Sequence, residues 1–86
     1  MVMLNQTRIL LNLAMLAVQG ENRVLSLHVR AAVNLGCSRE EIRETLIQTV
    51  TFAGVVRATE ACRTAQDVFD ALDASNHSEL DSQQES

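Results

Sequence analysis

The chain has 86 residues and a net charge of −4, and 47% of its residues are hydrophobic. This length fits one domain, and so high a hydrophobic fraction excludes a disordered chain. Its basic residues are all arginines scattered along an acidic chain, which argues against a nucleic-acid partner because neutralising phosphates requires a basic surface.

The residue types favour an all-α fold. Phe52 and Phe69 are the only aromatic residues, and proline is absent. A core of Leu, Ile, Val, Met and Ala packs well between helices, and Ala, Leu and Met form helices readily. Strands would require more turn residues than this chain has. We therefore predict a small helical bundle of four helices, separated at Gly20 and Gly54 and, between them, at Gly36.

The first predicted helix covers about residues 5–19 and is apolar on nearly every side, although Asn12 interrupts the apolar run. Such a helix is buried on more than one side. The run is too short to cross a bilayer, which needs about 20 apolar residues. The residues before it lack the basic region and small-residue cleavage site of a signal peptide, so none is expected. We expect a cytoplasmic protein without a membrane partner.

The second predicted helix covers about residues 21–35, and its apolar positions recur at steps of three and four. Positions with this spacing share one helix face. They are Val24, Leu25, His28, Ala31, Ala32 and Leu35. His28 is the titratable residue of this face. It is either a hydrogen-bonded structural residue or a group that transfers protons. Glu21, two turns earlier, would orient the imidazole or favour the helix start.

The third predicted helix begins after Ser38, where Ser38 and Glu41 have the spacing of a capping box. Its inward positions are Ile42, Leu46, Thr49, Val50 and Ala53. The fourth covers about residues 56–72, with apolar positions Ala58, Ala61, Cys62, Ala65, Val68, Phe69 and Leu72. Residues 73–86 have no apolar stripe, so we predict a folded domain over residues 1–72 and a disordered, polar acidic tail over residues 73–86.

The two cysteines, Cys37 and Cys62, have neither Cys-x-x-Cys nor zinc spacing. Two free buried thiols are expected, and the position of Cys37 before a helix N-terminus should lower its thiol pKa. One His and one Glu do not make a metal site, so no metal is expected. A small helical domain without disulfide or metal is marginal alone, and self-association would cover the first helix. We expect a homo-oligomer.

The order and spacing of several segments add a more specific indication. Residues 7–16 lead into Leu27-His28-Val29-Arg30, and residues 36–44 and 48–55 follow. Together these segments closely resemble the carboxymuconolactone decarboxylase family, whose helical fold is that of alkylhydroperoxidase D. The resemblance covers about residues 4–72. It implies an all-α bundle that assembles into trimers or hexamers.

The resemblance also implies an activity, the cofactor-free decarboxylation of 4-carboxymuconolactone or a related small carboxylated lactone in aromatic compound degradation. The family histidine falls on His28, which implies that His28 is the proton donor, with Glu21 as its orienting partner. Loss of CO₂ leaves a carbanion on the unsaturated lactone, and this carbanion must be protonated. Either Arg8 or Arg30 would bind a substrate carboxylate as a bidentate fork.

Two of the chain's departures from the family pattern bear most directly on its activity. The peroxidase branch has a Cys-x-x-Cys pair upstream of its histidine, whereas residues 21–24 contain no cysteine, so disulfide-based peroxidase activity is not expected. Full-length decarboxylases carry an extra N-terminal helical stretch that helps to close the active site, and this chain begins close to the first core helix. The alternative is therefore a non-catalytic oligomeric or regulatory protein on the same fold.

Overall fold

The computed structural model describes residues 4–85, with side chains for residues 4–76. The described residues form four helices and are all-α, as predicted. These are α1 (Asn5–Gln19), α2 (Asn22–Asn34), α3 (Arg39–Gln48) and α4 (Val50–Glu85). Residues 1–3 of the predicted domain and residue 86 of the predicted tail lie outside the described residues.

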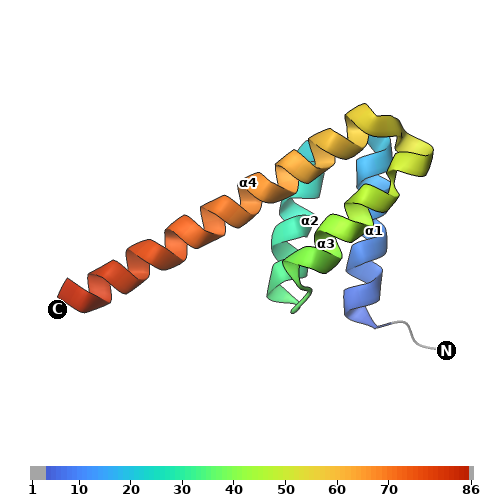
Figure 1. Ribbon diagram of the computed structural model, residues 1–86. Coiled ribbons are helices and arrows are strands. Elements are labelled where there is room, and N and C mark those ends of the chain that lie inside the picture. The colour runs from blue at the N-terminus through green and yellow to red at the C-terminus, as the bar shows by residue number, and fades with distance from the viewer. Residues whose placement is uncertain (1–3, 86) are drawn as a thin grey trace.

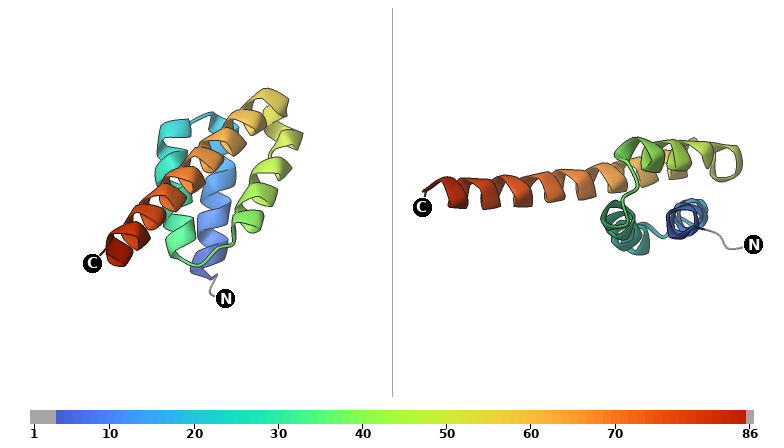
Figure 2. Two further views of the ribbon diagram at one scale, coloured as in Figure 1. Left: turned by 60° about the vertical axis from the view of Figure 1, so that its left-hand side comes forward. Right: turned by 90° about the horizontal axis from the view of Figure 1, so that it is seen from below.

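The helices are arranged in two layers, one of α1 and α2 and the other of α3 and α4 (Figure 2). The α1–α2 pair is an antiparallel hairpin, and α4 crosses over it (Figure 1). Burying one apolar face of each layer against the other is the usual way in which a small domain builds its core. The C-terminal part of α4 extends beyond the other three helices (Figure 1).

Local signals explain where the helices begin and end. Gly20 has φ 76°, and its N–H donates to Ala17 while the N–H of Glu21 donates to Leu16. This left-handed stop strongly favours glycine. The capping box is confirmed, because the Glu41 N–H donates to the Ser38 hydroxyl at 3.0 Å and the Ser38 N–H to the Glu41 carboxylate at 2.9 Å.

The core joins all four helices. Its largest fully buried side chains are Phe69, Leu13, Leu25, Ile42, Leu46 and Val29. The predicted inward faces of the third and fourth helices are confirmed for the most part, although Val50 is exposed. Among the described residues, none of the helices is both long enough and apolar enough to cross a bilayer.

The predicted face of the second helix was wrong by part of a turn. The buried positions of α2 are Leu25, Val29 and Ala32, whereas Val24 and Leu35 are exposed. Because α4 and α1 cover α2 along the line through Val29, the neighbouring His28 lies at the margin of the core and is half-buried. This position lets the imidazole reach both protein and solvent.

The fourth helix is longer than predicted at both ends. α4 begins at Val50 and passes through Gly54, whose φ of 85° and ψ of 168° are not helical. The separation predicted at Gly54 is thus present as a kink between two helical parts, and the positive φ there strongly favours glycine. Beyond Leu72, where we expected the packed helix to end, the backbone continues as helix to Glu85. The division into a domain and a polar tail stays a prediction.

Candidate functional site

His28 borders a pocket between the first two helices. The pocket has a volume of about 330 Å³ and is lined by Asn12, Met15, Leu16, Gln19 and His28. The four α1 residues are spaced at steps of three and four, so they share one face of α1. Antiparallel packing of α2 on α1 brings His28 to this face. The pocket is thus built by tertiary packing of two helices.

One hydrogen bond fixes the chemistry of the His28 ring. Its Nδ1 lies 3.0 Å from the carbonyl oxygen of Val24, one turn earlier in α2. Because a carbonyl only accepts, this contact assigns the ring proton to Nδ1. Nε2 is then the nitrogen left for a ligand, as an acceptor in the neutral ring and as a donor in the imidazolium form.

The polar groups around His28 are neutral. Asn12 and Gln19 each carry an amide that can both donate and accept hydrogen bonds. Sequence reasoning noted Asn12 only as an interruption of an apolar run and did not consider Gln19. The signal that would have found them is their separation of seven residues, which places both on the same face of α1.

The other predicted site residues lie outside this pocket. Glu21 is the exposed residue that precedes α2, and its side chain makes no capping bond. It is two helical turns, roughly 10 Å, from His28 along the helix axis. Arg8 and Arg30 are both exposed, and neither lines the pocket. The roles of Glu21, Arg8 and Arg30 stay predictions.

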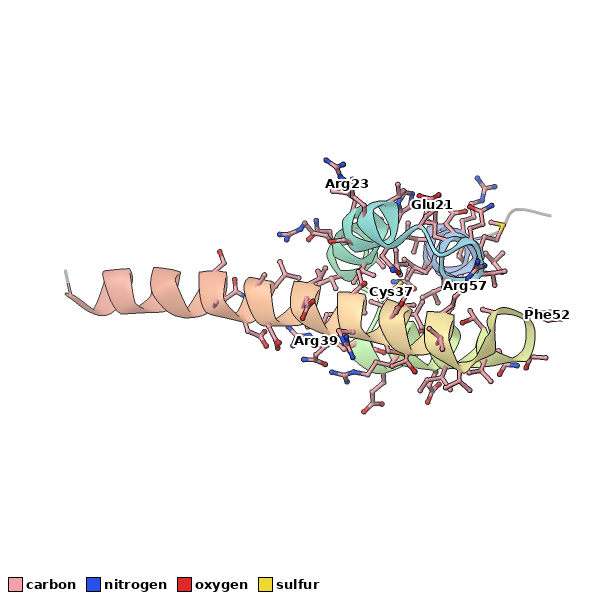
Figure 3. The ribbon with its side chains drawn as sticks, turned by 90° about the horizontal axis from the view of Figure 1, so that it is seen from above. Glu21, Arg23, Cys37, Arg39, Phe52 and Arg57 are labelled. Carbon is pink, nitrogen blue, oxygen red and sulfur yellow. The ribbon has the colours of Figure 1, made fainter. Side chains whose placement is uncertain are left out.

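A residue that the sequence analysis missed holds the turn beside Glu21. Arg57 of α4 donates from its guanidinium to the carbonyl of Val18 at 2.6 Å, and its side chain packs against Gly20. Figure 3 shows Arg57 reaching α1 from α4. The bond satisfies one of the carbonyls left free in the last turn of α1. Arg57 thereby ties the end of the hairpin to the second layer.

Both cysteines are free, as predicted, with Cys37 buried and Cys62 half-buried. The expectation of a lowered pKa for Cys37 was wrong. Burial raises the pKa of the Cys37 thiol, and the Glu41 carboxylate raises it further. Burial likewise raises the pKa of the Cys62 thiol, against the opposing charge of Arg43. Thiols that resist ionisation are poor nucleophiles, so neither is a candidate reactive group.

A larger groove, the α1–α3 groove, runs along the other side of α1 with a volume of about 700 Å³. Its described lining has no charged side chain and comprises Thr7, Leu10, Leu11, Ala14, Met15, Val18, Gln19, Thr45, Gln48, Thr49 and Phe52. Met15 and Gln19 also line the His28 pocket. The two cavities therefore share a wall.

The geometry defines a class of protein, an all-α bundle with a histidine facing a neutral polar pocket between its first two helices. The sequence matches the carboxymuconolactone decarboxylase family over residues 5–67, which include α1, α2, α3 and the first part of α4. The chain belongs to this family, and its fold is of the alkylhydroperoxidase D-like type. The resemblance found in the sequence is thus confirmed.

A curated relative supports the same assignment. The chain is 32% identical over 66 residues to the 4-carboxymuconolactone decarboxylase of Acinetobacter baylyi. The similarity covers 77% of this chain but 49% of the relative. The chain thus spans about half the length of the curated relative that it matches.

Proposed function

We propose that this protein decarboxylates 4-carboxymuconolactone or a related small carboxylated lactone without a cofactor, and that His28 is the proton donor. The observation that carries the proposal is the position of His28. It lies within the family match, and it borders a pocket with Nδ1 bonded to Val24 and Nε2 left for substrate. A relative that is a 4-carboxymuconolactone decarboxylase gives the substrate class.

The proposed reaction needs only groups that this pocket contains. The bond between the substrate carboxylate and the lactone ring breaks, CO₂ leaves, and the electron pair spreads into the unsaturated lactone. The amide N–H groups of Asn12 and Gln19 would stabilise the negative charge that develops on oxygen. The imidazolium of His28 then donates the Nε2 proton to a ring carbon and recovers a proton from water. One proton is consumed for each CO₂ released.

Glu21, Arg8 and Arg30 have supporting parts in this proposal. Glu21 would help to orient the His28 imidazole, and Arg8 or Arg30 would bind a second carboxylate of the substrate. Because none of the three lines the pocket, we expect replacing any of them to cost less than replacing His28. An arginine that binds substrate should raise KM when replaced, with a smaller change in kcat.

The test is to follow CO₂ release from 4-carboxymuconolactone. We expect turnover by the wild type and a loss of roughly 10²–10⁴-fold in His28→Gln, the range for removing a general acid. Arg8→Gln and Arg30→Gln are compared with Arg23→Gln, because Arg23 is exposed on α2 and outside the pocket. Turnover that is equal in wild type and His28→Gln would refute the role of His28.

A second candidate function is a non-catalytic oligomeric or regulatory protein on the same fold. Apolar residues exposed near the α1–α3 groove favour it, Phe52, Val55 and Val56 among them. Exposed apolar patches mark interaction surfaces. This candidate predicts a well-folded, self-associating protein that releases no CO₂ from any carboxylated lactone. Wild-type turnover that depends on His28 would exclude it.

A further inference from the structure

We infer that Arg57 is a positioning residue for the His28 pocket. From α4 it binds the last turn of α1, and this bond holds the Gln19 amide in the pocket wall beside His28. The position of the amide follows from the hydrogen bonds of the turn, whereas its effect on catalysis rests on the proposed function.

The last turn of α1 forms most of the pocket wall that His28 faces. Met15, Leu16 and Gln19 all line the pocket, and α1 ends at Gln19. The last carbonyls of a helix have no partner within the helix, and helix ends fray unless other groups bind these carbonyls. A frayed last turn would carry the Gln19 amide away from His28. The shape of the pocket therefore depends on what binds the carbonyls of this turn.

Two of these carbonyls are bound by the turn itself, and Arg57 binds a third. The N–H groups of the two residues that follow α1 donate to the carbonyls of Ala17 and Leu16, each at 3.1 Å. The Val18 carbonyl accepts a hydrogen bond from the Arg57 guanidinium at 2.6 Å. The last turn of α1 contains no basic residue of its own. Arg57 thus also supplies the positive charge that stabilises a helix C-terminus.

The bond to Val18 acts directly on Gln19. The Val18 carbonyl and the Gln19 N–H belong to one planar peptide unit, so a bond that fixes the carbonyl also fixes the backbone from which the Gln19 side chain extends. The charge of the guanidinium makes this bond stronger than one between neutral groups. The Arg57 side chain also packs over Gly20, with its Nε 3.6 Å from where a Cβ would stand. The guanidinium is therefore both packed against the turn and bonded to it.

α4 makes a second contact with the same turn. Asn22, the first residue of α2, donates from its side-chain amide to the Glu60 carboxylate at 3.4 Å, a longer bond than the one from Arg57. Arg57 and Glu60 are three residues apart and lie on one face of α4. Ala58 and Ala61, which follow them, are buried and let α4 lie close to the hairpin. The turn is therefore bonded to α4 at the end of α1 and at the start of α2.

This contact has a consequence for the proposed reaction. There the Gln19 amide stabilises the negative charge that develops on the substrate oxygen. Misplacing a group that acts only on this charge lowers kcat and leaves KM nearly unchanged. A displacement of about 1 Å costs up to about 10²-fold in rate. Because Asn12 stays in place, we expect loss of the Arg57 bond to lower kcat by about tenfold and to change KM by less than about twofold.

The test compares the wild type with Arg57→Met and Arg57→Lys by NMR relaxation and by CO₂ release. Arg57→Met keeps an unbranched side chain over Gly20 and removes the donor to Val18. The order parameter of the Gln19 N–H should fall from about 0.85, typical of rigid backbone, towards about 0.6, and kcat should fall by about tenfold. Arg57→Lys should restore both, because a lysine ammonium also donates to a carbonyl.

Gln6→Met is the matched control. Gln6 donates from its side-chain amide to the Leu35 carbonyl at 2.9 Å, so it binds a helix C-terminal carbonyl at the other end of the same hairpin, outside both cavities. This variant removes a bond of the same kind at a distance from His28. We expect it to leave the order parameter of Gln19, kcat and KM unchanged. Circular dichroism checks that every variant is helical.

Three results would overturn the inference. They are an order parameter of Gln19 that is unchanged in Arg57→Met, an equal fall in Gln6→Met, and an active wild type whose kcat is unchanged in Arg57→Met. A wild type that releases no CO₂ would instead refute the proposed function. The order parameter of Gln19 in the two Arg57 variants would then still decide whether Arg57 positions the pocket wall.

Discussion

The two phenylalanines of this protein occupy opposite environments on one helix. Phe69 is fully buried, with the guanidinium carbons of Arg39 and Arg43 lying 5.0 and 5.2 Å from its ring centroid. Phe52, near the start of α4, stands almost wholly in solvent. Both are apolar residues of α4, so neither residue type nor secondary structure explains why one ring is buried and the other exposed. α3 and the hairpin cover one ring, and no described residue covers the other.

The groups that surround the two rings also differ. Around Phe69 the polar groups are paired, since Arg39 forms a two-bond ion pair with Asp73 and Arg43 donates to Gln66. Around Phe52 lie an open apolar groove and, across one wall, the His28 pocket. The surroundings of Phe69 therefore stabilise the fold, whereas the surroundings of Phe52 contain the two cavities.

The largest expected effect is on the packed ring. Phe69→Ala should lower the free energy of unfolding by about 3–5 kcal/mol, the cost of deleting a buried aromatic side chain and leaving a cavity. Phe52→Ala should change it by less than about 0.5 kcal/mol in dilute, dissociated protein, as at other exposed positions. Urea denaturation measures both. Equal losses would show that the two rings do not differ as the structure describes.

A smaller effect is expected at the start of α3, which positions Arg39 and Arg43 over Phe69. Ser38→Ala removes the side-chain half of the capping box and should cost about 1 kcal/mol. Ser75→Ala is the matched control, because Ser75 is exposed within α4 and caps no helix start. Thermal or urea unfolding compares them. A loss in Ser75→Ala as large as in Ser38→Ala would contradict the capping role.

The smallest expected effect is on how far the stability of the fold falls at acidic pH. The hydrogen bond from Arg39 lowers the pKa of Asp73, and the Ser38 backbone and hydroxyl lower the pKa of Glu41. A carboxyl with a lowered pKa adds stability above its unfolded value, and this contribution disappears as the pH falls through the folded value. Stability should therefore decline on acidification below about pH 4.

Both carboxyls are exposed, so the decline should be modest and weaker at high salt. Comparing urea midpoints at about pH 6 and about pH 3 measures it. Asp73→Asn should reduce the difference between the two midpoints, and Asp67→Asn, which removes an exposed carboxyl of α4 outside the ion pair, should not. An unchanged difference in Asp73→Asn would show that the Arg39 pair contributes nothing.

Local signals made much of the fold predictable. Gly20 and the apolar run before it gave the bounds of α1, and the Ser38 to Glu41 spacing gave the start of α3. Both signals depend only on interactions among a few residues that are close in the sequence. The burial of Val29 in place of His28 was not predictable in this way, because apolar steps define a face only to within part of a turn. Which part is covered depends on where the neighbouring helices lie.

The candidate site was predictable only in its central residue. His28 could be found because it lies on a partly apolar face within a family-like segment. Asn12 and Gln19 come from another helix and meet His28 only when α1 and α2 pack. Arg57 lies far along the chain from the Val18 carbonyl that it binds. Pairings of this kind are set by tertiary structure, which a single sequence does not display.

The most direct test of the proposed function is the single-turnover release of CO₂ from 4-carboxymuconolactone by wild type and His28→Gln, compared at equal concentration and equal state of association. We expect release by the wild type and a rate at least about a hundredfold lower in the variant, because the variant lacks the Nε2 proton donor. Release at the same rate in both proteins, or by neither, would contradict it.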